Sequence, residues 1–398
     1  RISYQNVALM VGPAPAFSAH SGAANHIEDR ASKLRTLNLI QNADFNFSIE
    51  RNEVPQIGGF ALTARKVSQA PSVNFGFTYL LSDGRNEDML GFCISGQNSA
   101  FLSGLHEKDK DRNFFLVVTD KQEKDANLAK DYSNFDVLSF GNCFPVAYSL
   151  QASVGAFTEV NLEYSASNIK AEKPNAAYTA FGETQVSGVI PAINPENGQV
   201  ATSADTHGYL ISSGSAGIGT ATPMAGTQNT GDIHYLRPGD IELTLAQPSV
   251  PGALLSGSSP QRMHINQVSL NVPIVRTDAK GFGSNYVTER KPQFPSICSL
   301  NFSATANNFN QENLDNIFTK DEKYNFTITF KDPTEGQKPT NKAIELQIND
   351  AVCQSQNFSQ SIGGNMEVNA GFNFECTPFT GLKFSGIASL QDSAATYN

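Results

Sequence analysis

The sequence predicts a mainly β protein with two tandem copies of a β-sandwich or open barrel, each with one short flanking helix and a long hairpin loop. Three observations lead to this fold class. Many short segments alternate apolar and polar residues, which is typical of strands with one buried and one wet face. Only 17% of the 398 residues are charged and 27 are Phe, which favours a sheet interior over long solvated helices. Several alternating segments also occur twice in the same order, and such repeats decide the architecture.

The clearest repeat lies near the end of each half of the chain. SVGAFTEVNLEYSA (Ser153–Ala166) aligns without a gap with SIGGNMEVNAGFNF (Ser361–Phe374), and five of the aligned residues are identical. Both segments alternate throughout, so we expect each to form one strand with an apolar face and a polar face. The polar faces carry carboxylates and amides, namely Glu159, Asn161, Glu163, Glu367, Asn369, Asn373 and Glu375.

Earlier segments repeat in the same order. The pairs are FNFSIER at 45–51 with LNVPIVR at 270–276, ARKVSQAPSVNFGF at 64–77 with ERKPQFPSICSLNF at 289–302, and FFLVVT at 114–119 with NFTITF at 325–330. In each of them, apolar residues such as Phe45, Phe47 and Ile49 are expected to point inward. We therefore predict a first domain at 1–171 and a second at 233–398. The segment 172–232 has the Gly/Ser/Thr-rich composition of a linker or insertion.

Each copy is expected to hold one short helix. In the second copy Asn310 can cap a turn in which Leu314, Ile317 and Phe318 share a face. The counterpart in the first copy is Asp83–Phe92.

A long hairpin loop follows the first strand of each copy, at Arg51–Ala70 and at Arg276–Phe294. Paired glycines at equivalent places predict a turn with positive φ at each tip. Loops of this length usually have a function, so we expect them to make contacts between subunits. The alternative is a set of solvated charges of little energetic weight. The residues concerned are Arg51, Gly58, Gly59, Arg65, Lys66, Arg276, Gly281, Gly283, Arg290 and Lys291.

Charge and cysteine content exclude several classes of protein. A net charge of −10 argues against tight binding to nucleic acid, which depends on clustered Lys and Arg. The five cysteines form no CxxC pair, so reduced, mostly buried thiols are expected and neither a zinc knuckle nor a paired disulfide framework. No run of 18 apolar residues occurs, and the first 30 residues lack the core of a signal peptide. These features predict a soluble protein made in the cytoplasm.

The sequence offers no convincing catalytic or metal site. It contains no GxSxG nucleophile elbow and no HExxH motif, and its Gly-rich stretch at 214–222 lacks the Gly-Lys-Ser/Thr ending of a phosphate loop. Glu159 and Glu163 are close enough for acid and base work, but a solvated sheet face explains them as well. We expect no enzyme activity, no catalytic residue, no metal and no cofactor.

Two copies of a β domain without a site suit a closed ring, because heterologous contacts between like modules close when the rotation divides a full turn. The segments FNFSIERNEVPQIGG, PSVNFGFTY and SIGGNMEVNAGFNF resemble the tail tube proteins of long-tailed, siphovirus-type bacteriophages. The resemblance covers both copies. With two copies in one chain, the sequence is similar to the duplicated, T5-like members of this family. It implies a tail-tube-like β-sandwich, with homotrimeric pseudo-hexameric rings that stack into a hollow tube.

The resemblance also implies partners and a location. The chain would contact itself within and between rings, and other tail proteins such as the tape measure, tail tip and terminator. Double-stranded DNA would pass through transiently and without sequence preference, and no membrane would be bound. The protein would lie in the virion tail after assembly in the host bacterial cytoplasm. The polar strand faces would line the lumen, because a wall with few cations keeps phosphate contacts weak. The alternative is that these faces are turned to the exterior solvent.

Other functions remain open at this point. A repeated β-sandwich adhesin that binds carbohydrate is one alternative, although Trp, a common sugar platform, is absent. A tail-tip ring protein of the same fold and a glycan-cleaving β enzyme are two others.

Overall fold

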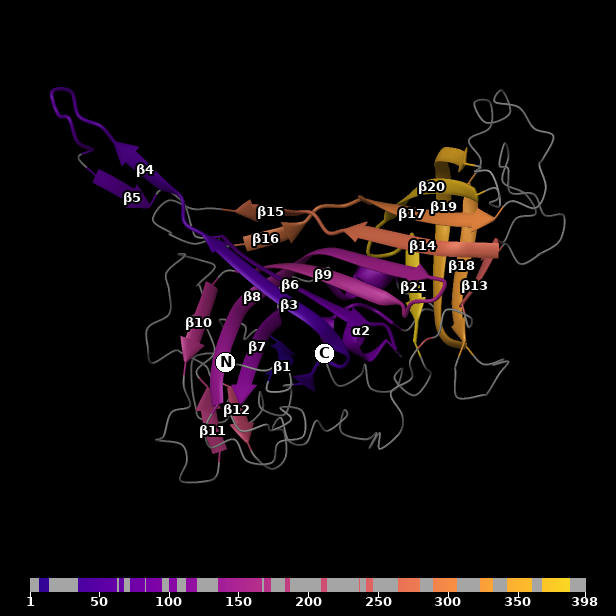
Figure 1. The fold of residues 1–398 in the computed structure, drawn as a ribbon, viewed down its shortest axis with the longest axis horizontal. Helices are drawn as coiled ribbons and strands as arrows, with labels where there is room; N and C mark the ends of the chain where they lie inside the picture. The colour runs from indigo at the N-terminus through magenta and orange to yellow at the C-terminus, as the bar shows by residue number, and fades with distance from the viewer. Residues whose placement is uncertain are drawn as a thin grey trace.

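The computed structural model describes residues 7–13, 35–62, 64–67, 72–82, 84–94, 100–105, 112–119, 135–166, 168–172, 183–186, 209–212, 236, 241–245, 264–279, 289–305, 323–331, 342–359 and 367–386. These residues form antiparallel strands with almost no helix, which confirms the mainly β prediction. Figure 1 shows the strands of residues 7–172, the first half, beside those of residues 241–385, the second half. None of the described helices is long and apolar enough to span a membrane.

The first half contains β1 (Val7–Pro13), β2 (Arg35–Thr36), β3 (Ile40–Ser48), β4 (Arg51–Val54), β5 (Ala64–Val67), β6 (Ser72–Leu80), α2 (Arg85–Leu90), η3 (Phe101–Leu105), β7 (Arg112–Thr119), β8 (Phe135–Ser153), β9 (Glu159–Ala166) and β10 (Asn168–Glu172). The second half contains β13 (Ile241–Leu245), β14 (His264–Pro273), β15 (Arg276–Ala279), β16 (Glu289–Pro292), β17 (Ser296–Thr305), β18 (Tyr324–Lys331), β19 (Lys342–Ser359), β20 (Glu367–Cys376) and β21 (Leu382–Ser385). Between them, β11 (Glu183–Val186) pairs with β12 (Tyr209–Ser212).

The two halves pair their strands in the same order. The corresponding pairs are β1·β7 and β13·β18, β3·β6 and β14·β17, β4·β5 and β15·β16, β6·β9 and β17·β20, β7·β8 and β18·β19, β8·β9 and β19·β20, and β8·β10 and β19·β21. Two residues in different halves are called equivalent below when they hold the same place in this pairing. Leu150 and Phe358 are one such couple, because they oppose Val160 and Val368.

One long strand in each half belongs to two sheets. The first part of β8 pairs with β7 and β10, and its second part pairs with β9. The chain turns between the two parts at Asn142, which has a φ of 50°, and the equivalent Asp350 has a φ of 58°. At both places an Asn on the neighbouring strand accepts a hydrogen bond from this residue's N–H: Asn113 Oδ1 at 2.9 Å and Asn325 Oδ1 at 3.0 Å. Each half is therefore a sheet folded over on itself at a bulge.

Aromatic side chains fill the space enclosed by each folded sheet. In the first half, Phe75 stacks on Phe140 with ring centroids 4.3 Å apart, and Phe77 stacks on Tyr164 at 5.9 Å. In the second half, Phe302 stacks on Phe372 at 5.6 Å. All of these side chains are buried. The many Phe residues thus form the interior that the composition predicts, since each ring removes a large apolar area from water.

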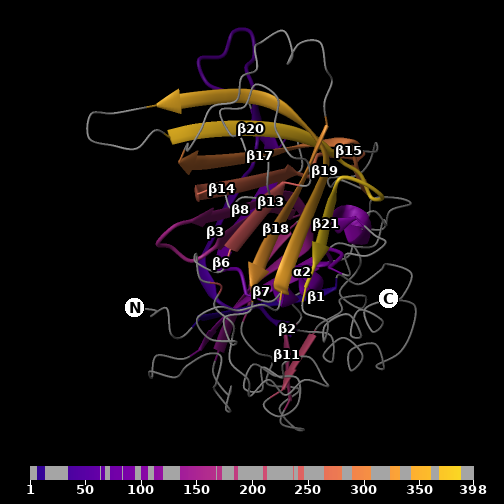
Figure 2. The same ribbon diagram turned by 90° about the vertical axis from the view of Figure 1, so that its right-hand side faces the viewer.

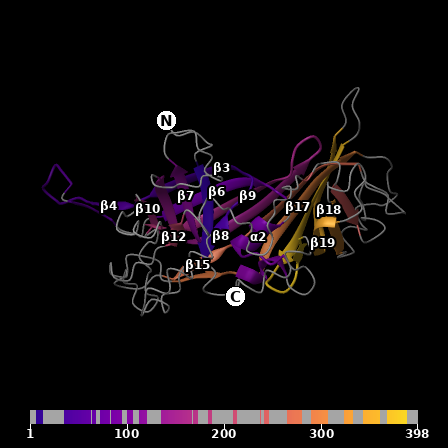
Figure 3. The same ribbon diagram turned by 90° about the horizontal axis from the view of Figure 1, so that it is seen from below.

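The pairing of β8 with β14 joins the halves into one sheet. Its strands follow the order β3, β6, β9, β8, β14, β17, β20 and β19. Figure 2 shows β8, β14, β17 and β20 side by side, and Figure 3 shows β17, β18 and β19 at one end of the molecule while β15 reaches toward the first half at the other. We call these eight strands the continuous sheet.

The helix predicted at Asp83–Phe92 is confirmed in a shorter form as α2, which lies between Gly84 and Gly91, both at positive φ. The helix predicted around Asn310 lies outside the described residues. The strand predicted from Ser153 begins only at Glu159, because Ser153 ends β8 and the intervening residues turn, with Gly155 at a φ of 90°. A turn between two strands of similar alternation cannot be told from a strand by periodicity alone.

One alignment made from the sequence is wrong by one residue. Phe114 opposes Phe140, and Phe326 opposes Ile348, the equivalent of Phe140. Phe114 therefore matches Phe326 and not Asn325. A second expectation also fails: Phe45, Phe47 and Ile49 do not all point into a closed core, and they are 44%, 60% and 41% exposed.

Candidate functional site

One face of the continuous sheet is polar along its whole width. Residues directly opposite each other on neighbouring strands point to the same face. One such row crosses seven of the strands, through Asn42, Thr78, Asn161, Ser149, Asn271, Ser299 and Asn373. The core lies on the opposite face, so this row faces away from the packed interior.

The residues predicted for a lumen all lie on this polar face. Glu159, Asn161 and Glu163 are exposed on β9. Four more lie on β20, where Asn373 is half-buried and the others are exposed: Glu367, Asn369, Asn373 and Glu375. The structure brings the two sets onto one surface, with β8, β14 and β17 between them.

The polar face is acidic and amide-rich. The eight stretches of chain that form the continuous sheet, from residue 144 of β8 and residue 352 of β19 onward, contain no Lys or Arg. Their carboxylates all lie on the polar face: Asp44, Glu159, Glu163, Glu367 and Glu375. The sheet strands themselves offer phosphate groups only negative charge and neutral dipoles. Two cations from β15–β16, Arg276 and Arg290, lie against this face at Phe144, and Arg290 is paired there with Asp278.

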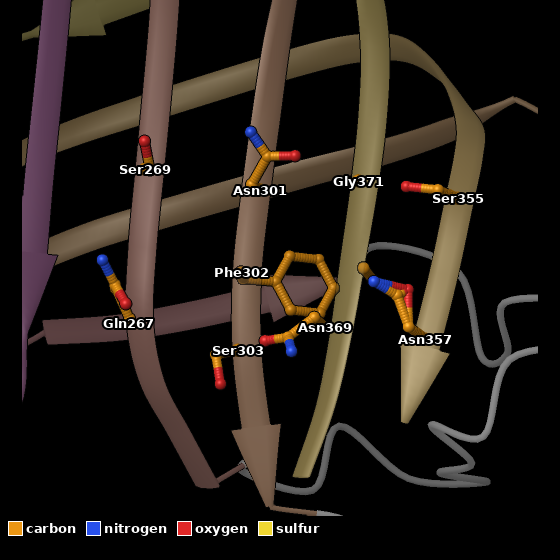
Figure 4. Close-up of a pocket in the computed structure, with 10 residues that line it drawn as sticks. Gln267, Ser269, Asn301, Phe302, Ser303, Ser355, Asn357, Asn369 and Gly371 are labelled. Carbon is orange, nitrogen blue, oxygen red and sulfur yellow. The ribbon is translucent and has the colours of Figure 1, made fainter. Parts of the chain in front are cut away.

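The second half of this face is hollowed. A hollow of about 230 Å³ lies over β14, β17, β20 and β19, and Figure 4 shows its lining of amides and hydroxyls. Its floor is Gly371, where a Cβ atom would come within 2.9 Å of Asn301 Oδ1 and of Ser355 Oγ. The equivalent of Gly371 in the first half is Glu163, which faces Gly76. The hollow is therefore neutral, while its counterpart in the first half carries charge.

Each end of the continuous sheet is an unpaired edge among the described residues. At one end β3 pairs only with β6, and at the other the last part of β19 pairs only with β20. Phe45 and Phe47 stand on β3, whereas their equivalents on β14, Leu270 and Val272, are fully buried. The difference follows from pairing, because β14 has β8 at its outer side. An exposed apolar edge without Lys or Pro is a template for another strand.

The hairpin β15–β16 packs against the first half. Arg290 Nη1 donates to the backbone oxygen of Ser165 at 2.9 Å and to its Oγ at 3.0 Å. The guanidinium also forms an ion pair with Asp278 at 3.3 Å, and the Arg290 side chain is only 9% exposed. The Cζ atoms of Arg276 and Arg290 lie 5.0 and 5.5 Å from the centre of the Phe144 ring. These contacts tie the hairpin to the sheet by hydrogen bonding and cation–π attraction.

The equivalent hairpin β4–β5 projects away from the body of the molecule (Figures 1 and 3). It keeps the same internal ion pair, with Arg65 Nη2 2.9 Å from Glu53 Oε1, but here the two side chains are 64% and 54% exposed. Ile57 and Phe60 near the tip are fully exposed. Gly58 has the predicted positive φ of 87°, whereas Gly59 does not. Gly281 and Gly283 lie outside the described residues.

The remaining predicted hairpin residues lie on the same strands. Arg51 and Lys66 are exposed on β4 and β5. Lys291 lies on β16 opposite Thr277. The basic residues of each copy therefore lie together on one hairpin. The two hairpins differ in their surroundings, because β15–β16 packs against the first half whereas β4–β5 projects away from the molecule.

A buried polar cluster lies beneath α2. Tyr79 Oη donates to Glu87 Oε1 at 2.6 Å, and Tyr148 Oη donates to the same atom at 3.4 Å. Burial, together with the Glu87 charge, raises the pKa of both tyrosines well above the usual 10.0. Burial raises the pKa of the neighbouring Asp88 to about 6, while the Arg112 guanidinium lowers it. Through Glu87 these hydrogen bonds join α2 to β6 and β8, on the core side of the sheet and away from the polar face.

No other chemistry gathers in the described part of the chain. There, no group of three or more His, Cys, Asp or Glu side chains is placed to hold a metal ion. None of the five cysteines forms a disulfide in the structure, and Cys143, Cys298 and Cys376 are buried.

The sequence missed two residues at the contact between the halves, Phe144 and Ser165. It also missed Val352, the equivalent of Phe144, which is exposed on β19. Because Phe144 and Val352 are different residue types, the alignment of the two copies did not reveal that they are equivalent. Only the pairing of the strands reveals that they stand at the same point.

The sequence matches no known family and no curated protein. Several solved structures are similar in part. A chain of the sheath-tube complex of an extracellular contractile injection system is 10% identical, covers 37% of this chain and 88% of its own, and gives a TM-score of 0.26. The tube-terminating cap of the anti-feeding prophage is 12% identical, with 41% and 99% covered and a TM-score of 0.27. The tail of a gene transfer agent particle is 14% identical, with 37% and 97% covered and a TM-score of 0.22.

Proposed function

We propose that this chain is the structural subunit of a hollow tail tube in a phage-like particle. Its two halves are copies of one tube domain, joined by the segment 172–232. Three chains form a ring of six domains, and the rings stack into a tube through which double-stranded DNA passes. The chain acts by shape and charge, without a catalytic residue, a metal or a cofactor.

The continuous sheet is the observation that carries this proposal. Two halves with the same strand order are joined edge to edge by β8 and β14. The two end strands that have no further partner in the described part of the chain, β3 and the last part of β19, are the equivalents of the two strands that join. A chain with two such edges binds its own copies head to tail, and a head-to-tail contact closes into a ring when the rotation permits.

The polar face supports a lumen. A ring of continuous sheets turns one face inward, and the acidic, amide-rich face without Lys or Arg in the sheet strands suits a wall along which DNA slides. The apolar face is already used by the core of each half. Glu159, Asn161, Glu163, Glu367, Asn369, Asn373 and Glu375 then line the channel.

The proposal places the protein in the virion tail, after assembly in the cytoplasm of a bacterial host. Its partners are further copies of itself, within and between rings, and the tape measure, tail-tip and terminator proteins that a tail requires. DNA is a transient partner, and no membrane is bound.

Negative-stain microscopy and analytical ultracentrifugation of the purified chain test the proposal. Rings or stacked tubes with a hollow centre, and a ring mass equal to three chains, are the expected result. Monomers at every concentration would contradict it, and glycan binding by such monomers would favour an adhesin. Isolated rings that do not stack, present once per particle, would assign the chain to the tail tip.

A further inference from the structure

We infer that the contact between successive chains of the ring repeats the β8–β14 junction residue by residue, with β19 of one chain paired to β3 of the next and the β4–β5 hairpin laid over the neighbour. This inference rests on the proposed ring. The inference adds to the proposed ring a strand register between β19 and β3 and a hydrogen bond from the β4–β5 hairpin. Both are taken from the β8–β14 junction that exists inside the chain.

The register follows from equivalent residues. Inside the chain, Leu270 on β14 opposes Leu150 on β8. Phe45 is the equivalent of Leu270, because the β3–β6 and β14–β17 ladders run in the same register with a bulge at the same place. Phe358 is the equivalent of Leu150. The same correspondence gives Asp44 with Ser359, Phe45 with Phe358, Asn46 with Asn357, Phe47 with Gln356, and Ser48 with Ser355.

The apolar side of β3 agrees with this partner. Phe45 and Phe47 are 44% and 60% exposed in the single chain, whereas Leu270 and Val272 are fully buried at the equivalent places. Leu270 and Val272 reach that state because β8 and the first half lie beside them. A second copy that presents β19 covers Phe45 and Phe47 in the same way.

The hairpin supplies the hydrogen bond. Arg290 reaches the backbone oxygen of Ser165 beside Phe144. The equivalents of these three residues are Arg65, Asn373 and Val352. Arg65 therefore donates to the backbone oxygen of Asn373 in the next chain, and Val352, now 39% exposed, forms the apolar platform beneath it.

The ion pair within the hairpin supports the same placement. Both hairpins orient their Arg with a carboxylate on the opposite strand, Glu53 in one and Asp278 in the other. Only the hairpin that has a neighbour buries its Arg. The side chain of Arg65 is 64% exposed and that of Arg290 is 9% exposed, so Arg65 is preorganised for a surface that the single chain does not contain.

A disulfide between chains tests the register. Two backbone hydrogen bonds across the β8–β14 junction define its hydrogen-bonded positions. The N–H of Val154 donates to the carbonyl of Asn266 opposite it, and the N–H of Ile274 donates to the carbonyl of Val146. Ser149 and Asn271 fall between such positions and form a non-hydrogen-bonded pair, whose Cβ atoms lie close enough to be bridged. The equivalent pair across the ring contact is Asn46 with Asn357. The double variant Asn46→Cys, Asn357→Cys should give covalent multimers under mild oxidation, with a ladder that stops at the number of chains in the ring.

Matched variants define the register. Ser149→Cys with Asn271→Cys should close within one chain and leave a monomer on a denaturing gel. Asn46→Cys with Ser355→Cys lies on the same face two residues out of register and should give far less multimer. Each single variant controls for the native cysteines. Rings that form without the Asn46–Asn357 bridge, or that bridge better in the shifted variant, would overturn the inferred register and leave the proposed ring intact. Failure to form rings at all would overturn both.

A charge exchange tests the hairpin. Glu53→Arg combined with Arg65→Glu keeps the ion pair but moves the guanidinium to the other strand. If Arg65 donates to the neighbour, this exchange and Arg65→Ala should both raise the protein concentration needed for rings by about tenfold or more, the effect of losing a charged hydrogen bond. Unchanged assembly of the exchange variant would refute the role of Arg65. Circular dichroism verifies that each variant folds.

Discussion

Asn142 shows how a single residue shapes the fold. It turns β8 from one sheet into the other at a φ of 50°, a conformation that Asn adopts more readily than most side chains. The side chain of Asn113 accepts from its N–H and is itself fully buried. The equivalent acceptor in the second half, Asn325, is only half-buried. The same hydrogen bond is thus made in two environments of different polarity.

Replacing these acceptors should cost different amounts. Asn113→Ala removes a buried acceptor and should lower the free energy of unfolding by about 1–3 kcal/mol, the cost of depriving a buried donor of its partner. Asn325→Ala should cost less, because water reaches this site. Urea unfolding of the two variants measures the difference. Equal losses would show that burial does not set the strength of this bond.

Asp88 makes stability depend on pH. Its pKa in the folded protein is about 6, raised by burial from 3.8 and opposed by Arg112, and its Oδ2 is buried without a hydrogen-bond partner. Between pH values of about 4 and about 6, the folded chain keeps a proton that the unfolded chain releases. Asp88 therefore contributes fully to stability below a pH of about 4, and this contribution is lost as the pH rises through about 6.

Asp88→Asn should remove this dependence. The free energy of unfolding of the variant, relative to the unaltered chain, should rise between pH 4 and pH 7, because the neutral amide carries no charge to bury. Thermal unfolding across this range measures it, with Asp136→Asn, at an exposed site, as the control. Parallel curves for the unaltered chain and Asp88→Asn would contradict the assignment.

At the scale of elements, equivalent strands have different surroundings. Sequence periodicity located β3 and β14, and the repeat placed their hairpins correctly. It could not predict that Phe47 is exposed while Val272 is buried, because burial depends on which strand lies alongside, and β8 is distant in sequence from β14. The sequence predicted an alternating strand with one polar face at β9 and another at β20, and both strands alternate in burial. That β8, β14 and β17 carry this face across both halves came only from the ladder pairings.

The contrast between Phe144 and Val352 can be tested at this scale. Val352→Phe would give the ring contact the aromatic platform that Phe144 provides inside the chain. A cation–π contact at an exposed site contributes about 0.5–1 kcal/mol, so rings should form at a concentration roughly two- to fivefold lower. Sedimentation across a dilution series measures the shift. Val352→Leu, which adds apolar area without a ring face, is the control, and equal effects of the two variants would exclude a cation–π origin.

At the scale of the whole molecule, the orientation of the polar face in the proposed ring would decide what the ring encloses. The sheet strands put five carboxylates and no Lys or Arg on one side. Turned inward, this surface surrounds DNA without holding it. Turned outward, it would be an ordinary solvated surface.

A label distinguishes the two orientations. Asn369→Cys stands near the hollow on the polar face, and a gold-bearing maleimide attached there should appear along the axis of assembled tubes in negative stain. The unaltered chain treated in the same way controls for its native thiols. Gold on the outer wall would show that the face is external.

The pairing of β8 with β14 also sets an order of events. Two strands tethered in one polypeptide meet at an effective concentration set by the tether, which exceeds the concentration of separate molecules in dilute solution. In the proposed ring, each newly made chain would therefore complete its internal seam before it meets another copy, and only the seams between chains would remain sensitive to dilution. Each chain would thus join the proposed ring with its curvature already fixed at the internal β8–β14 seam.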